Sequence, residues 1–124
     1  MARDRLVEFD VPADGIRVIY PGAPAALPIS ADDIETVKHK FVLDTPHVIL
    51  GVGRFIPRKG HITLVRAMPA VLKRHPDAVL VLVGRGPRLY ETVKEANALG
   101  VRNSVLFPGV VSDTDLAGLY AACE

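Results

Sequence analysis

Two apolar segments of strand length most constrain the fold of this 124-residue chain. Residues 47–53 read HVILGVG and residues 78–84 read AVLVLVG, so both runs end in glycine. A strand that is apolar at successive positions is buried on both faces, which is typical of a parallel sheet covered by helices on its two sides. A weaker run, SVLFPG over residues 104–109, predicts a third strand.

The stretches between these runs have the periodicity of helices. The first has apolar residues on one face at Leu64, Val65, Met68, Val71 and Leu72. Pro69 falls inside it and removes one backbone hydrogen bond, so we predict a bend or a 3₁₀ turn there. Strands that alternate with helices through short connections predict an α/β fold, with a Rossmann-like, right-handed parallel sheet and flanking helices.

Two more helices are predicted after the second and third strands. Their apolar faces are Leu89, Val93, Ala96 and Leu99 in the first, and Leu116, Leu119, Tyr120 and Cys123 in the second. Gly100 is placed to end the first of them in the left-handed conformation. Ser112, three residues before Asp115, is placed to cap the second.

The N-terminal part indicates a lead-in followed by a domain. Residues 1–15 predict a helix or a linker segment, and residues 16–124 predict the domain itself. Within the domain, Ile16–Tyr20 predicts a short strand that ends at a Pro-Gly turn. Ser30 predicts the start of a helix, because Asp33 can form a capping box with it.

The composition excludes several classes of protein. The net charge of +1 is not that of a nucleic-acid binder, and no apolar run approaches the length of a membrane span. The charged N-terminus lacks the apolar segment of an export signal. The single Cys123 fits a reducing compartment. We therefore expect a cytoplasmic protein that binds no nucleic acid.

Cations gather where the predicted strands end, and ligands of open parallel sheets bind beyond the carboxyl ends of the strands. The loops at these ends contain Arg54, Arg58, Lys59, Arg85 and Arg88. No acidic residue occurs between Thr45 and Pro76. We expect Arg54 and Lys59 to bind a phosphate group, next to a helix N-terminus at Gly60 whose free N–H groups favour an anion.

Glycines and histidines in and near these loops lead to two further expectations. The glycines at positions 51, 53, 60, 84 and 86 are expected to let a ligand approach the backbone closely. The four histidines, at positions 39, 47, 61 and 75, are not spaced like metal ligands. We expect each histidine at the surface or at a helix cap.

Known phosphate-binding motifs match these loops poorly. A nicotinamide dinucleotide site carries G-x-G-x-x-G, but Ile56 stands where the third glycine belongs. Arg85 stands where that site has an acid, although an arginine suits the extra phosphate of NADP. The P-loop motif G-x-x-x-x-G-K-[ST] does not occur. A non-catalytic nucleotide- or phosphate-binding module and an NADP-type dinucleotide domain stay open as alternatives.

Three strings in order carry a resemblance to a known family. They are VGRFIPRKG over residues 52–60, LVRAMPAVLKRHPDAVLVLVGRGP over residues 64–87 and VLFPGVVSDTDLAGLYAAC over residues 105–123. Together they resemble the C-terminal, donor-binding domain of retaining glycosyltransferases with the GT-B fold, in family 4 (group 1). IRVIYPG, over residues 16–22, is similar to the segment that enters that domain.

The resemblance implies a site and a reaction. Residues that match Arg54, Lys59, Gly53 and Gly60 bind the diphosphate of a nucleotide-sugar donor, such as a UDP- or GDP-sugar. The loop that matches Gly84, Arg85, Gly86 and Pro87 lies near the nucleotide, and the stretch that matches Gly109, Val110 and Val111 lies beside the base. The reaction would be sugar transfer with retention of configuration, without a cofactor or a metal.

The chain also departs from the family pattern. Two glutamates separated by seven other residues, which contact the ribose and the sugar in the family, would lie beyond Glu124, and the acceptor-binding domain is absent. We therefore expect an incomplete donor domain that is inactive alone and whose partner is the missing acceptor domain. In such a piece the strand Val48–Val52 would be an exposed edge that pairs with a second copy, forming a homodimer.

Overall fold

The computed structural model describes residues 6–9, 11–17 and 28–123. In chain order the elements are η1 (Ala13–Gly15), α2 (Ala31–Phe41), β1 (Val48–Val52), η2 (Pro57–Lys59), α3 (His61–Leu72), β2 (Val79–Val83), α4 (Leu89–Ala98), η3 (Arg102–Ser104), β3 (Val105–Gly109) and α5 (Asp113–Ala122). The predicted strand at residues 16–20 and the turn after it fall mostly outside the described residues. No helix in the described ranges is long and apolar enough to cross a membrane.

The three strands form one parallel sheet, as the sequence predicts, and their order in the sheet is β1-β2-β3. β1 pairs in register with β2 from Val48 opposite Val79 to Val52 opposite Val83. The pairing of β2 with β3 shifts between Val81 and Val83, where β3 contains Pro108. Proline has no N–H for the ladder, so an irregularity at the edge of the sheet is where it is tolerated.

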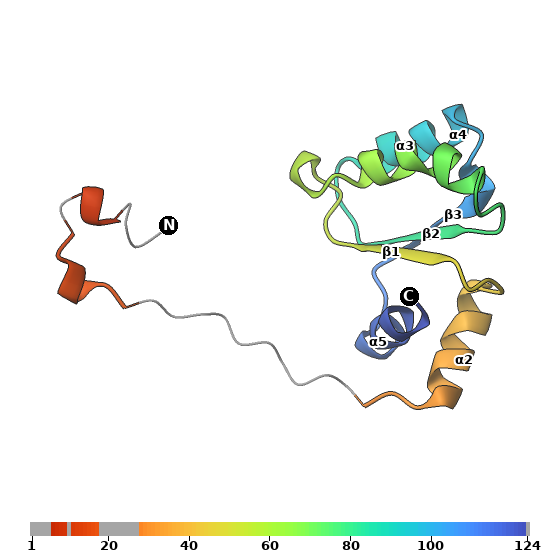
Figure 1. The fold of residues 1–124 in the computed structure, drawn as a ribbon, viewed down its shortest axis with the longest axis horizontal. Coiled ribbons are helices and arrows are strands. Elements are labelled where there is room, and N and C mark those ends of the chain that lie inside the picture. Colours follow the sequence, from red (N-terminus) through yellow and green to blue (C-terminus); the bar gives the residue numbers. More distant parts are fainter. Residues whose placement is uncertain (1–5, 10, 18–27, 124) are drawn as a thin grey trace.

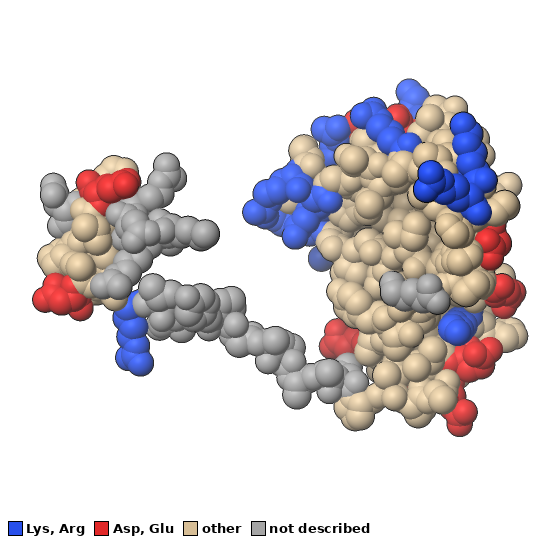
Figure 2. Space-filling view, viewed as in Figure 1, with Lys and Arg blue, Asp and Glu red and all other residues tan. Residues whose placement is uncertain are grey.

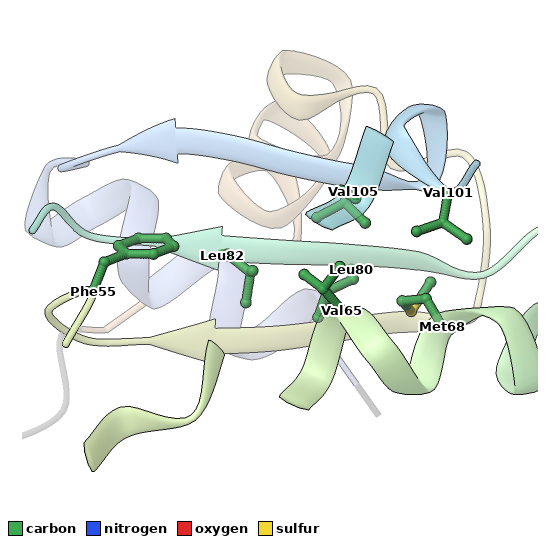
Figure 3. Close-up of a cluster of buried hydrophobic side chains, with 8 residues drawn as sticks. Phe55, Val65, Met68, Leu80, Leu82, Val101 and Val105 are labelled. Atoms are coloured by element: carbon green, nitrogen blue, oxygen red, sulfur yellow. The ribbon is translucent and has the colours of Figure 1, made fainter. Parts of the chain in front are cut away.

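Helices cover both faces of the sheet, which confirms the fold class (Figure 1). α3 and α4 lie on one face, and α2 and α5 lie on the other. Alternate residues of β2 therefore enter different cores. The α3/α4 core contains Phe55, Val65, Met68, Leu80, Leu82, Ala96, Val101 and Val105 (Figure 3). The α2/α5 core contains Val37, Leu43, Val48, Val81, Val83 and Leu119.

The predicted helix ends are confirmed where a local signal was present. Asp33 N donates to Ser30 Oγ at 3.1 Å and Ser30 N donates to Asp33 Oδ2 at 3.0 Å, which completes the capping box of α2. Ser112 caps α5 by accepting a hydrogen bond from Asp115 N at 3.1 Å. Gly100, which follows the C-cap residue Leu99 of α4, has a φ of 67°, so the chain leaves that helix through the left-handed conformation.

Two details of the helices differ from what we expected. α3 stays an α-helix across Pro69, so the 3₁₀ turn does not form within it, and the alternative, a bend, stays a prediction. Val65 and Met68, which precede Pro69 on the buried face of α3, stabilise the helix enough to tolerate the lost hydrogen bond. Tyr120 does not belong to the buried stripe of α5, because its side chain is 59% exposed.

Candidate functional site

The three loops that follow β1, β2 and β3 lie together at the carboxyl end of the sheet. We call them the strand-end loops; they comprise residues 53–60, 84–88 and 110–112. Two backbone hydrogen bonds join the first loop to the second, Phe55 N to Arg85 O (3.0 Å) and Arg88 N to Phe55 O (3.0 Å). Two more join a loop to the end of the neighbouring strand, Gly53 N to Val83 O (3.0 Å) and Gly84 N to Gly109 O (2.7 Å). The predicted site residues on these loops are thus brought to one edge of the molecule.

Glycine is required at two positions because the first two loops touch. A Cβ atom on Gly84 would lie 2.0 Å from Gly53 O, and a Cβ atom on Gly86 would lie 2.6 Å from Phe55 O. The neighbouring atoms belong to backbone, which cannot move aside as a flexible side chain does. We expected these glycines to admit a ligand. The structure shows that they admit the neighbouring loop, and their contact with a ligand stays a prediction.

Phe55 anchors the first loop in the core. Its side chain is fully buried, and its ring stacks on His61 with 4.3 Å between ring centroids and 17° between planes. Its backbone N–H and C=O are both hydrogen-bonded to the second loop. Arg54, the next residue toward β1, is therefore attached to a fixed point. Phe55 was not identified from the sequence, although an aromatic residue between cations in a loop indicates a side chain that anchors the loop in the core.

Lys59 folds back toward the start of the same loop. It ends the 3₁₀ turn η2, and Gly60 then takes the left-handed conformation, with a φ of 68°, before α3 begins. The atoms of Lys59 nearest to a Cβ built on Gly53 are its side-chain carbons, at 3.5 to 3.7 Å. The aliphatic part of Lys59 therefore lies over Gly53, and this brings Lys59 back to the residue that precedes Arg54.

The charges on these loops are mostly unpaired. Among the described residues, Arg54, Arg58, Lys59 and Arg85 form no ion pair or side-chain hydrogen bond, and all four are exposed. Arg88 differs, because its guanidinium pairs with Glu91 one turn later in the chain. Figure 2 shows Lys and Arg side chains gathered over the end of the sheet where η2 lies. This end of the molecule can bind an anion without first breaking an ion pair.

His61 is neither at the surface nor the cap residue of α3, which is Gly60, so the expectation for it is wrong. Its side chain is 5% exposed at the first position of α3, and its Nδ1 has no hydrogen-bond partner among the described residues. Burial, and to a lesser degree the charge of Lys59, lowers the pKa of the imidazole. A cavity of about 150 Å³ beside it is lined by Phe55, Ile56, Pro57, Gly60, His61, Ile62, Thr63, Arg88 and Thr92.

The third loop presents backbone and apolar side chains. Gly109 ends β3 with a φ of 78°, Val110 is exposed and Val111 is half-buried. Gly109 O accepts the hydrogen bond from Gly84 N, so this loop lies against the second one. In the described part of the chain, no group of three or more His, Cys, Asp or Glu side chains is arranged to hold a metal ion.

Comparison with known proteins identifies the family. The family model described as glycosyl transferases group 1 matches residues 33–124. The chain is 36% identical over 94% of its length to the glycosyltransferase MJ1607 of Methanocaldococcus jannaschii. It is 33% identical over 98% of its length to the GDP-mannose-dependent alpha-(1-6)-phosphatidylinositol monomannoside mannosyltransferase of Mycobacterium tuberculosis. It covers 30% and 32% of the lengths of these two relatives.

A solved structure has the same fold. The crystal structure of Anabaena Alr3699/HepE in complex with UDP superposes with a TM-score of 0.81 at 24% identity. The match covers 98% of this chain and 34% of that one. The three-stranded sheet and its helices therefore correspond to part of a GT-B glycosyltransferase. The chain belongs to the group 1 glycosyl transferases and spans about one third of the length of the relatives that it matches.

Proposed function

We propose that this chain binds the diphosphate of a nucleotide-sugar donor and forms that part of a retaining glycosyltransferase. One observation carries the proposal: Arg54 and Lys59 lie on one anchored loop at the carboxyl end of the sheet, exposed and without an acid partner among the described residues. Membership of the group 1 family supports it.

The proposed roles follow from charge. When the bond between sugar and phosphate breaks, negative charge develops on the leaving nucleoside diphosphate, and fixed cations stabilise it. The planar guanidinium of Arg54 can donate two parallel hydrogen bonds to phosphate oxygens, whereas Lys59 supplies a compact charge. Gly53 and Gly60 lie beside these two cations, and their own N–H groups donate to Val83 O and Pro57 O, so we assign them the close approach of the diphosphate and not a hydrogen bond to it. Chemistry of this kind needs no metal ion bound by the chain.

The nucleotide would lie along the second and third strand-end loops. We assign its neighbourhood to Gly84, Arg85, Gly86 and Pro87, and the edge of its base to residues 109–111. The names of the similar proteins leave two bases open. The Mycobacterium tuberculosis relative is named GDP-mannose-dependent, whereas Anabaena Alr3699/HepE was crystallised with UDP and with UDP and glucose.

The domain assignment is part of the same proposal. Residues 16–124 would form the donor-binding part and residues 1–15 a lead-in. Because the chain covers about a third of its relatives' length, transfer would also need an acceptor-binding partner domain. We expect the 124-residue chain to bind the donor without transferring the sugar.

Calorimetry with UDP, GDP, UDP-glucose, GDP-mannose and NADP tests the proposal. We expect one nucleoside diphosphate and its sugar to bind, and Arg54→Ala or Lys59→Ala to weaken binding by roughly tenfold or more. Lys73→Ala is the matched control, because Lys73 is an exposed cation at the opposite end of α3. Tighter binding of NADP, or equal losses in all three variants, would contradict the proposal.

The exposed edge of the sheet leads to a further prediction, that the chain forms a dimer. Within the described residues β1 has a strand on one side only, and Val52 at its end is exposed. Its sequence, VILGV, contains no charge that would discourage pairing with another strand. We expect two copies to associate through β1. Sedimentation should then show a dimer, and Val52→Lys, at an exposed position of β1, should shift it to a monomer. A wild-type monomer at high concentration would rule the dimer out.

A further inference from the structure

Two histidines meet at the amino end of the sheet, opposite the strand-end loops. His47 directly precedes β1, and His75 lies between α3 and β2. His75 Nδ1 lies 3.2 Å from His47 Nε2, and the ring centroids are 4.3 Å apart. The two residues are 28 positions apart in sequence, so no spacing motif reveals the pair.

The backbone holds both residues in place. His47 O accepts a hydrogen bond from Val79 N at 2.9 Å, which continues the β1–β2 pairing by one step. His75 N donates to Val71 O at 2.9 Å and His75 O accepts from Ala78 N at 3.0 Å. The rings are therefore presented from fixed backbone positions, and only the side-chain torsions are free to adjust.

The separation of the two nitrogens suits a shared metal ion. In the absence of a metal, one nitrogen must carry a proton and donate it to the other. When both are deprotonated, two lone pairs face the same small space. Two imidazole nitrogens bound to one Zn²⁺ lie roughly 2.9–3.4 Å apart when the N–Zn–N angle is between those of square-planar and tetrahedral coordination. The observed distance of 3.2 Å falls in this range.

The surroundings leave room for further ligands. A hollow of about 210 Å³ lies beside the two rings, and its lining residues are Pro46, His47, Val48, Ile49, Val71, His75 and Ala78. A water molecule occupies about 30 Å³ of liquid volume, so the hollow has space for the waters that would complete a coordination shell.

We propose that His47 and His75 form a binding site for a divalent transition-metal cation such as Zn²⁺ or Cu²⁺. Imidazole nitrogen suits these ions, whereas Mg²⁺ selects oxygen ligands, so the site discriminates against Mg²⁺. The bound ion links the start of β1 to the connection between α3 and β2. It stabilises the pairing of these two strands and takes no part in binding at the strand-end loops, so the inference is independent of the proposed function.

Calorimetry with ZnCl₂, CuCl₂ and MgCl₂ on the tag-free chain at near-neutral pH tests the site. We expect Zn²⁺ and Cu²⁺ to bind and Mg²⁺ not to bind. His47→Gln and His75→Gln should each weaken Zn²⁺ binding roughly tenfold or more. His39→Gln is the matched control, because His39 lies exposed on α2 and forms no side-chain contact with another described histidine. It should bind Zn²⁺ like the wild type.

A second measurement locates the ion without a variant. Substoichiometric Cu²⁺ should broaden the NMR signals of residues around positions 47 and 75 first and leave those of residues 53–60 sharp. Absence of Zn²⁺ binding at millimolar concentration would overturn the site. Equal Zn²⁺ affinity in His75→Gln and the wild type would also overturn the site. So would Cu²⁺ broadening centred away from positions 47 and 75.

Discussion

The two ends of the sheet differ in whether their polar side chains are paired. At the amino end, polar side chains have partners: Thr45 Oγ1 donates to Asp77 Oδ2 at 2.7 Å and accepts from His47 N at 3.0 Å, and His47 meets His75. The hydrogen bond from Thr45 is the main cause that lowers the pKa of Asp77. At the carboxyl end, cations without an acid partner among the described residues lie on one loop.

This difference shows which interactions hold the loops at the carboxyl end in place. Like charges that lie close together repel, so exposed cations on one loop do not stabilise the fold. That loop is instead held by Phe55 in the core and by backbone hydrogen bonds to the second loop. The anchor and the charges are therefore separate, and variants can change one without the other.

The largest expected effect comes from removing the anchor. Phe55→Ala should lower the free energy of unfolding by about 3–5 kcal/mol, because a fully buried aromatic side chain leaves a cavity. Phe9→Ala, at a position 78% exposed, is the control and should change little. Urea denaturation measures both. If Phe55→Ala does not fold, Phe55→Leu should still lose about 1.5 kcal/mol. A loss no larger than the control's would mean that Phe55 is not the anchor.

The next effect tests the contact between the loops. Gly84→Ala should cost about 2–4 kcal/mol, because the added Cβ would lie 2.0 Å from Gly53 O and the φ of 135° is unfavourable for alanine. Gly100→Ala is a matched control with a positive φ of 67° and nothing within 4 Å of the added atom. The excess loss in Gly84→Ala measures the close approach. Equal losses would show that the loops can separate easily.

A smaller effect compares the two ends directly. Thr45→Val should lower the free energy of unfolding by about 1 kcal/mol, because it removes hydrogen bonds at the amino end. Arg54→Ala at the carboxyl end should change stability by no more than about 0.5 kcal/mol. Both are measured by urea denaturation without nucleotide. A stability loss in Arg54→Ala as large as in Thr45→Val would mean that Arg54 has a structural role.

The smallest expected effect is a pH dependence from His61. Its pKa is lowered from 6.5 in the folded chain, so the unfolded chain binds more protons as the pH falls. Its contribution to stability is therefore complete above pH 6.5 and decreases as the pH falls toward the folded pKa. Denaturation between about pH 5 and pH 8 should show this slope, and His61→Phe should reduce it. If stability depends on pH equally in His61→Phe and in the wild type, other titratable groups cause the dependence.

Much of the fold and part of the site could be predicted from local signals. The three strands, the caps at Ser30 and Ser112 and the left-handed Gly100 are each encoded within a few neighbouring residues. The position of Arg54 and Lys59 at the end of β1 follows from the same patterns. Phe55 and His61 were missed as a pair, because their stacking depends on how the first loop folds over the N-terminus of α3.

The sequence by itself determined the alternation of strands and helices, the side of the sheet where cations gather and the family to which the chain belongs. These properties depend on hydrophobic periodicity, on helix caps and on short motifs, all of which are formed by residues close together in the sequence. Only the tertiary structure decided that Gly84 and Gly86 serve a contact between loops and that His47 meets His75. Such contacts join residues about thirty positions apart, and their energy arises only when packing of the two cores brings the strands into register.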